Sequence, residues 1–437
     1  MLTLEENLLL RRVEGDAPMS QWMQRHRTPV SKADDVSEAN GTPVKARLFG
    51  EDLVVCRDGD RRVGVRSEAC AQWRESLTFG RNEKGGMRCL YHGWKFDVEG
   101  NVLKMASEAV AVGLVGKTKH TVYRFKKWGG VMWAYLRPRE TAPGFARPPW
   151  AQAEEACVSI AKAIPRCDWA QILEGATDSA HSSNLPSSDM VPARIGGAKV
   201  TDEFWLWPPT DGAPRLQVEC TLWRLLRCAA PAFQERDHAR LRAHDVVRRT
   251  RRRSDSAQRF VRHRQRQRTV RQHFDGVCFI TWGHRSRTPG TETWRKFLRQ
   301  NVGVGRDEQY RPPRIADNHF LHDRRKMRSG DVARIGGSPN QDITMWVTKG
   351  PIADHTHERL GTSNLAIVEF RREMLDAVLT FQCAGQVIGG GDVWIPPTVY
   401  PFQAILMKTA DWRSHQAHYG WEAGEPAPEP SYPVTQR

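Results

Sequence analysis

The stretch from residue 70 to residue 100 constrains the fold most, because it spaces thiols and an imidazole as a metal centre requires. Cys70 stands nineteen residues before Cys89, and His92 follows Cys89 in a C-x-x-H pair. A [2Fe–2S] cluster held by two thiolates and two imidazoles takes one of each from two neighbouring loops. In the first of these loops Gln72 stands where a histidine is needed. Because the amide oxygen of glutamine is a hard, weak donor, the sequence predicts a cluster site with one defective ligand.

A C-x-x-H pair alone is a weak signal, since such a pair on a strand is more often a buried thiol and a hydrogen-bonded histidine. The surroundings of this pair favour a metal site. Gly85 and Gly86 predict a hairpin turn, and glycines allow backbone amides to approach bridging sulfides. Tyr91 and Trp94 flank the histidine and are expected to shield a cluster from water.

Length and composition indicate a cytoplasmic protein of two domains. The chain has 437 residues, of which 39% are hydrophobic, enough for two ordinary cores. No apolar run is long enough to cross a bilayer, and acidic residues interrupt the N-terminal segment where a secretion signal would be basic and then apolar. Nine cysteines, an odd number, indicate reduced thiols and a metal site rather than a disulfide framework.

The net charge of +16 is concentrated in one segment. Residues 221–280 hold 16 arginines, no lysine and 5 acidic residues, so that +11 of the net charge lies there. An evenly basic chain would indicate nucleic acid or an anionic membrane as a partner. Here the charge is a local anomaly, and its most basic part, residues 247–273, has almost no aromatic residue for base stacking. We therefore expect no nucleic-acid partner and no membrane partner.

Hydrophobic periodicity divides the chain into four parts. Residues 1–26 are predicted to be a helical lead-in, and residues 27–138 a small domain of short antiparallel strands. A proline-rich linker leads to a second domain at 150–422. Residues 423–437 are rich in proline and polar residues and predict a disordered tail.

The second domain mixes element types. Helical spacing predicts helices within 167–181, 292–303 and 365–382, whereas alternation predicts a strand at 341–353. This mixture, together with the strands of the first domain, indicates the α+β class.

Two further motifs of the second domain could bind a metal. Asp178 and His181 are three apart and so are expected on one face of the predicted helix. By itself such a pair is more often a capping aspartate and a solvated histidine. Asp342, at the start of the predicted strand, would by itself be an ordinary turn residue.

The cluster segment, including "FGRN" at 79–82 and "YHGWKFD" at 91–97, resembles that of the Rieske non-heme iron ring-hydroxylating oxygenases. The resemblance covers nearly the whole chain and points to the oxygenase (alpha) subunits of the phthalate 4,5-dioxygenase and 3-chlorobenzoate dioxygenase type. This family implies an N-terminal Rieske [2Fe–2S] antiparallel β-sandwich. It also implies a C-terminal helix-grip catalytic domain, in which a curved antiparallel sheet and helices enclose an iron.

The resemblance implies the ligands of the cluster. Cys70, Cys89 and His92 are expected to bind it, and Gln72 occupies the position of the fourth ligand. The [2Fe–2S] Rieske cluster is therefore the first expected cofactor.

The second expected cofactor is a mononuclear Fe(II). The resemblance places it on His181 and Asp342, with Pro186 at the position of the family's second histidine. Asp178 is expected to hydrogen-bond His92 of the partner subunit and to carry an electron between the two centres.

The family implies a terminal oxygenase that receives electrons from an NADH-dependent iron–sulfur flavoprotein reductase. With O2 it would cis-dihydroxylate an aromatic carboxylate of the phthalate or 3-chlorobenzoate class, as a homotrimer or a dimer of trimers. Arg194 is the candidate for binding the carboxylate, since arginine pairs bidentately, and a surface arginine is the alternative. An O-demethylating Rieske monooxygenase with the same iron site is the alternative activity.

The most basic stretch, residues 247–273, does not fit a folded catalytic domain, because so many guanidinium groups cannot be buried unpaired. One hypothesis is that residues from about 220 to 274 are an out-of-frame reading of a GC-rich gene, with a shorter slip at 70–76 and a miscall at Pro186. It predicts that the restored frame has histidine at position 72 and an alternating β pattern in 221–275. The other hypothesis is a catalytically dead protein whose basic arm binds an anion or nucleic acid.

Overall fold

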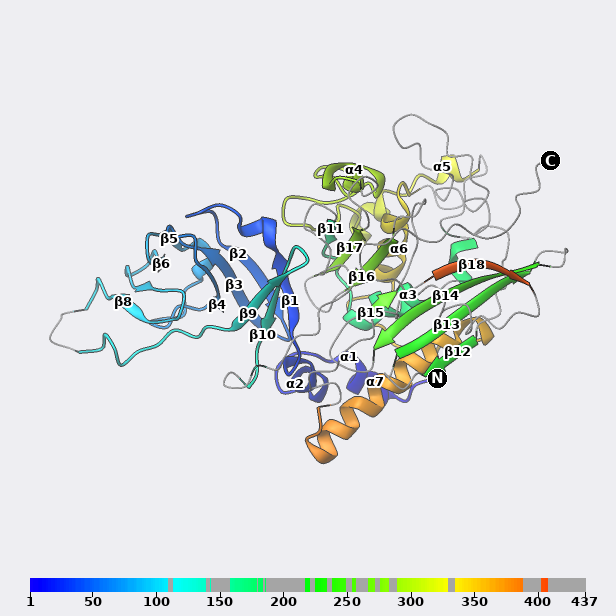
Figure 1. The fold of residues 1–437 in the computed structure, drawn as a ribbon, viewed down its shortest axis with the longest axis horizontal. Helices are drawn as coiled ribbons and strands as arrows, with labels where there is room; N and C mark the ends of the chain where they lie inside the picture. The colour runs from blue at the N-terminus through cyan, green and yellow to red at the C-terminus, as the bar shows by residue number, and fades with distance from the viewer. Residues whose placement is uncertain are drawn as a thin grey trace.

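The computed structural model places three small sheets at one end of the molecule and one large sheet with most of the helices at the other (Figure 1). It describes residues 1–108, 113–138, 142, 158–178, 180–183, 185, 276–282, 289–328 and 335–387, and the backbone of strands within 217–271 and at 402–407. Within this part of the chain, no helix is long and apolar enough to cross a membrane.

The small sheets are antiparallel, as the sequence predicts. Their strand orders are β1-β10-β9, β2-β3-β4 and β5-β6-β7-β8. A Cβ at Gly86, where the β5-β6 hairpin turns, would lie 2.1 Å from the carbonyl oxygen of Phe96, so only glycine fits there. The strands are β1 (Thr28–Lys32), β2 (Val44–Leu48), β3 (Glu51–Arg57), β4 (Val63–Ser67), β5 (Arg81–Glu83), β6 (Gly86–Arg88), β7 (Lys95–Phe96), β8 (Val102–Lys104), β9 (Arg124–Trp128) and β10 (Val131–Tyr135).

The large sheet has the order β11-β17-β16-β15-β14-β13-β12, with β18 paired to β14, and all its pairs are antiparallel. The arginine-rich segment 221–275 supplies β13 to β16, so its backbone lies in the middle of this sheet. The out-of-frame hypothesis for this segment stays a prediction. The strands are β11 (Val158–Ala163), β12 (Gln217–Cys220), β13 (Leu225–Phe233), β14 (His238–Arg248), β15 (Ser254–Ser256), β16 (Arg266–Arg271), β17 (Val277–Trp282) and β18 (Phe402–Met407).

The three small sheets form the first lobe, and the large sheet with its helices forms the second lobe. The helices of the second lobe confirm three predictions and contradict one. The helices expected within 167–181, 292–303 and 365–382 are all present. The strand expected at 341–353 is wrong, because Ser338–Thr348 is a helix. Ile343 and Trp346 pack into a core on one face of it, whereas Met345 is 39% exposed. The described α-helices of this lobe are α3 (Trp169–Thr177), α4 (Thr291–Phe297), α5 (Arg324–Met327), α6 (Ser338–Thr348) and α7 (Leu365–Ala384). The 3-10 helices among the described residues are η1 (Ala33–Val36), η2 (Leu77–Phe79), η6 (Ala180–Ser183), η9 (Ala316–Leu321) and η10 (Thr362–Asn364).

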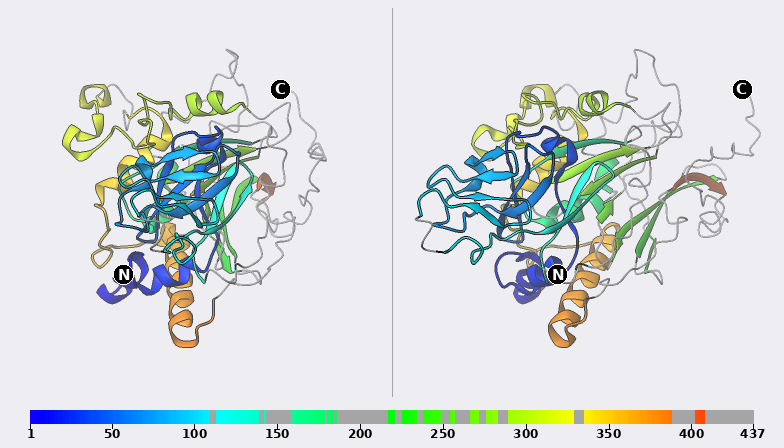
Figure 2. Two further views of the ribbon diagram at one scale, coloured as in Figure 1. Left: turned by 90° about the vertical axis from the view of Figure 1, so that its left-hand side faces the viewer. Right: turned by 60° about the vertical axis from the view of Figure 1, so that its left-hand side comes forward.

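The predicted helical lead-in forms α1 (Leu4–Arg11) and α2 (Pro18–Gln24). Thr3 and Glu6 build a capping box that starts α1. Both helices pack against α7, and α1 also contacts α3, as the two views of Figure 2 show for the N-terminus and α7. The lead-in therefore lies against the second lobe, and its core continues into the first.

A buried charge network fixes α3 between α1 and α7. Arg11 contacts Asp168, the N-cap of α3, at 2.7 Å and Glu174 at 2.9 Å. Arg371 of α7 donates to the same Glu174 carboxylate at 2.9 Å. Burial would raise the pKa of Glu174, but the two guanidinium groups hold it below its usual value. Removing one member would leave a buried charge unpaired, so the network specifies where α3 lies.

Candidate iron sites

Two short loops of the small sheets have the same backbone hydrogen bonds. The first cluster loop, residues 70–75, follows β4, and the second cluster loop, residues 89–94, joins β6 to β7. In the first, Cys70 N–H donates to the carbonyl of Glu75 at 2.8 Å and Arg74 N–H donates to the carbonyl of Cys70 at 3.1 Å. In the second, Cys89 N–H donates to the carbonyl of Trp94 at 2.8 Å and Gly93 N–H donates to the carbonyl of Cys89 at 3.1 Å.

The two thiols meet in the space between these loops. Cys70 and Cys89 are buried and are not in a disulfide. Burial, together with the neighbouring Cys89, raises the pKa of Cys70 to about 11. A metal displaces such thiol protons on binding. The expected role of both cysteines fits this geometry.

His92 offers one ring nitrogen without a protein partner. Its Nδ1 is buried and accepts or donates no hydrogen bond within the described residues. Tyr91 packs edge-on against the imidazole at 4.1 Å between ring centroids. Trp94 is buried, as expected of a shield, whereas Tyr91 is 60% exposed. A buried imidazole nitrogen without a partner in the described residues, three positions after Cys89, fits the expected role of a cluster ligand.

Gln72 lies at the edge of the same site. Its Nε2 donates to Ser107 Oγ at 3.2 Å and to Glu108 Oε1 at 3.4 Å. Ser107 also accepts from Trp94 Nε1 at 3.2 Å, so the segment after β8 joins both loops. The Oε1 atom of Gln72 is buried and has no hydrogen-bond partner in the described part of the chain. The site thus has two thiols and one imidazole suited to the cluster, and an amide at the fourth position.

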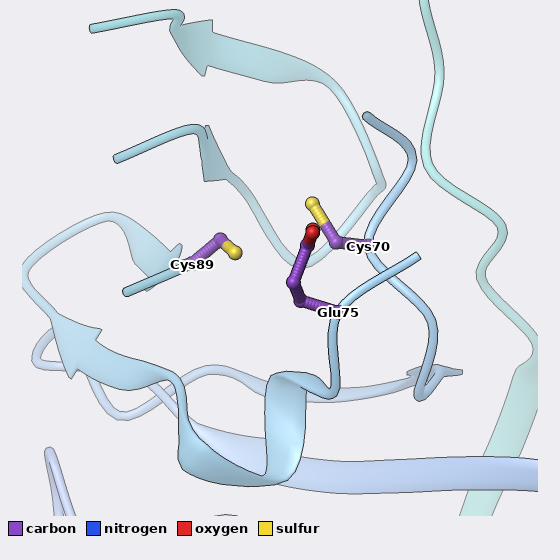
Figure 3. Close-up of side chains that lie close together, drawn as sticks. All are labelled: Cys70, Glu75 and Cys89. Atoms are coloured by element: carbon purple, nitrogen blue, oxygen red, sulfur yellow. The ribbon is translucent and has the colours of Figure 1, made fainter. Parts of the chain in front are cut away.

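A carboxylate that no sequence motif predicts also lies in this site. The thiol sulfurs of Cys70 and Cys89 and a carboxylate oxygen of Glu75 all lie within 4.8 Å of one another (Figure 3). An acid five residues after a cysteine carries no motif, so the sequence alone gives no signal for it.

The second candidate iron site gathers around His181. Its Nδ1 lies 3.5 Å from Asp178 Oδ2, and its Nε2 lies 3.3 Å from Asp342 Oδ1. Two details differ from the expectation. Asp178 is the C-cap of α3 and His181 belongs to η6, so they do not share one helix face. Asp342 comes from α6 and not from a strand.

Charge explains why this arrangement fits a cation. Burial lowers the pKa of His181, but the Asp178 and Asp342 carboxylates raise it to about 10. Burial raises the pKa of Asp178, and its hydrogen bond with His181 outweighs this and lowers it. Two carboxylates facing one imidazole attract one positive charge. A divalent iron bound to Nε2 and to Asp342 would supply it, while Asp178 orients the ring from behind.

Some expected residues cannot be placed. Pro186 and Arg194 lie outside the described residues. The contact of Asp178 with His92 of the partner subunit involves a second chain and stays a prediction.

Family models match both lobes. A Rieske [2Fe–2S] domain matches residues 26–114, and a LigXa C-terminal domain like family matches residues 134–435. The chain is 51% identical to the phthalate 4,5-dioxygenase oxygenase subunit of Pseudomonas putida, over 99% of this chain and 100% of that protein. It is 29% identical to the 3-chlorobenzoate-3,4-dioxygenase oxygenase subunit of Comamonas testosteroni, over 95% and 98%. The solved structure of NdmA with caffeine from Pseudomonas putida CBB5 has the same fold, with a TM-score of 0.52 and 13% identity over 90% of this chain and all of that one.

Proposed function

Because the chain belongs to the family of Rieske non-heme iron oxygenase subunits, we propose that it is the terminal oxygenase of a two-component ring dioxygenase. Its proposed substrate is an aromatic carboxylate of the phthalate class. The observation that carries this proposal is the 51% identity with the phthalate 4,5-dioxygenase oxygenase subunit over 99% of the chain. The fold agrees with it, since an α+β chain with a Rieske domain is what such a subunit needs.

The proposed reaction adds both atoms of O2 to adjacent ring carbons. The arene, O2, two electrons and two protons give one cis-dihydrodiol, and NADH supplies the electrons through a reductase. Bound to Cys70, Cys89 and His92, and to His181 and Asp342, the two iron centres supply the one-electron chemistry of O2 reduction.

The residues of this chain have separate tasks in that reaction. Asp178 holds the His181 ring from its Nδ1 side, so that Nε2 stays directed at Asp342. The burial of Asp342, which is 1% exposed, keeps water from competing for its oxygens. The network of Arg11, Glu174 and Arg371 fixes the helix that ends at Asp178.

The proposed partners follow from the same premise. An NADH-dependent iron–sulfur flavoprotein reductase would dock near the cluster loops. In a trimer, Asp178 would hydrogen-bond His92 of the partner subunit and so connect the two centres.

The test is product analysis with the purified chain, a phthalate-type reductase, NADH and 18O2. Phthalate, 3-chlorobenzoate and a methoxybenzoate are supplied separately. A cis-dihydrodiol carrying two labelled atoms is expected from phthalate or 3-chlorobenzoate. Formaldehyde from the methoxybenzoate, without dihydrodiol from the other acids, would instead identify an O-demethylase.

Two variants connect the activity to the described site. Asp342→Asn is expected to lower product formation at least 100-fold while the visible spectrum of the cluster is kept. The matched control is Asp317→Asn, which changes an exposed aspartate and is expected to leave turnover unchanged. Full activity in Asp342→Asn would contradict the assignment of this iron ligand.

A further inference from the structure

Glu75 occupies the middle of the cluster site. It closes the first cluster loop, because its carbonyl accepts the Cys70 N–H. Its side chain turns inward, and one carboxylate oxygen lies within 4.8 Å of the sulfurs of both Cys70 and Cys89. Figure 3 shows the three side chains pointing toward one another from the two loops. A metal held by the two thiolates would therefore lie within reach of this carboxylate.

In the part of the chain that the structure describes, no hydrogen bond accounts for the position of this carboxylate. Its Oε2 atom is buried and makes no hydrogen bond within the described residues. Metal binding would turn Cys70 and Cys89 into thiolates and place two more negative charges beside it. A half-buried carboxylate facing two thiolates is unfavourable without a cation, whereas iron between these groups offsets the repulsion. Glu75 is therefore arranged as a ligand and not as a structural acid.

Gln72 is the weaker candidate for the same task. Its Nε2 is already held by Ser107 and Glu108. Its Oε1 is neutral, and an amide is a poorer donor to iron than a carboxylate. His92, with its unpartnered Nδ1, supplies one nitrogen only.

We propose that Glu75 is the fourth protein ligand of the iron–sulfur cluster, taking the place of the imidazole that is absent at position 72. The ligand set is then Cys70, Cys89, His92 and the Glu75 carboxylate. This inference shares with the proposed function only the presence of the cluster. Its tests read iron, sulfide and spectra, so failed dioxygenation with an intact cluster contradicts the function and leaves the ligand set standing.

The first test compares three variants of the full chain, purified without oxygen after the codons for 70–76 have been resequenced. Glu75→Ala is expected to contain at least five-fold less acid-labile sulfide per chain than the parent protein. Gln72→Ala and the matched control Glu99→Ala, which changes an exposed acid of the same lobe, are expected to stay near the parent value. Full sulfide in Glu75→Ala, or a loss confined to Gln72→Ala, would overturn the proposal. A parent protein without acid-labile sulfide would do so as well.

A second variant separates loss of a ligand from loss of the fold. Glu75→Ala combined with Gln72→His removes the carboxylate and restores the imidazole. This double variant is expected to recover the sulfide content of the parent. If its sulfide content stays low, Glu75 is needed for the conformation of the loop and is not a replaceable ligand. The proposal is then wrong.

Pulsed EPR of the reduced cluster provides an independent measure. The parent protein is expected to show one strongly coupled imidazole nitrogen, from His92. Gln72→His is expected to show two. Two coupled nitrogens in the parent would overturn the carboxylate assignment.

Discussion

The two cluster loops have one backbone and two different sets of side chains. Each ties its cysteine to the residues four and five positions later by the same two hydrogen bonds. The residue four positions later has a φ of 69° in the first loop, at Arg74, and 72° in the second, at Gly93. The second loop has glycine there and His92, the expected ligand, whereas the first has an arginine, a glutamine and an inward carboxylate. The backbone thus fixes where ligands can lie, and the side chains decide which chemistry is offered.

The largest expected effect comes from the cysteines, where the two loops are equivalent. Cys70→Ala and Cys89→Ala each remove one of two thiolates from the same site. Both are expected to abolish cluster binding, measured as iron and acid-labile sulfide per chain, because the remaining ligands cannot hold the cluster alone. Cys56→Ala, which changes a buried thiol outside the loops, is the control. A cluster retained in only one of the two loop variants would break their equivalence.

The next effect concerns the residue that makes the loops differ most. Gln72→His makes the first loop a histidine donor like the second. If the new imidazole replaces Glu75, the proposed ligand, exchange of an anionic carboxylate for a neutral imidazole is expected to raise the reduction potential of the cluster by on the order of 100 mV. A spectroelectrochemical titration measures this shift. An unchanged potential would mean that position 72 does not reach the iron.

A smaller effect is expected where one loop has glycine and the other does not. Gly93→Ala puts a Cβ at a left-handed backbone position, 2.9 Å from the Cβ of Ala106. It is expected to lower the free energy of unfolding by about 1–2 kcal/mol. Arg74, at the matching position, already has a Cβ. Arg74→Ala is therefore expected to change the free energy of unfolding little. Urea unfolding of both variants provides the measurement, and equal losses would show that the loops are not alike.

The smallest effect depends on pH and concerns the ion pair of Arg88 and Glu83, which holds the second loop. Arg88 donates to Glu83 at 2.8 Å and to the carbonyl of Gly93 at 3.0 Å. Hydrogen bonds from Arg88 lower the pKa of Glu83 from 4.5 to about 2. Because the folded pKa is depressed, this stabilisation is complete above pH 4.5 and is lost as the pH falls toward 2.

Glu83→Gln is therefore expected to lower the free energy of unfolding by about 1 kcal/mol at pH 7, because solvent screens part of the interaction. The loss is expected to become smaller as the pH falls. The midpoint of urea unfolding at pH 7 and pH 3.5 tests this, with Glu99→Gln as the control. A cost that grows in acid would contradict the assigned direction.

The sequence predicts the strands around the loops well, since their hairpins have glycines at forced positions such as Gly86. It also predicts Cys70, Cys89 and His92 as cluster ligands by spacing, and these assignments stay predictions. It fails at 341–353, where Ile343 and Val347 imitate strand alternation although the exposed Met345 lies between them. The separation of Asp178 and His181 into two elements depends on where α3 ends, which spacing does not specify. Glu75 could not be found from spacing, because its position depends on the way the loop folds back.

The packing of α1 against α3 and α7 limits how far the two lobes of this chain can be treated as separate modules. Arg11 belongs to the first residues of the chain, yet it reaches the helix that ends at Asp178. A chimera that exchanges the cluster lobe at its sequence boundary would also exchange Arg11 and leave Glu174 with a mismatched partner. A functional exchange of lobes therefore needs to keep the first 26 residues together with the second lobe. The part that can be exchanged as one piece is thus made of two segments that are separate in the sequence.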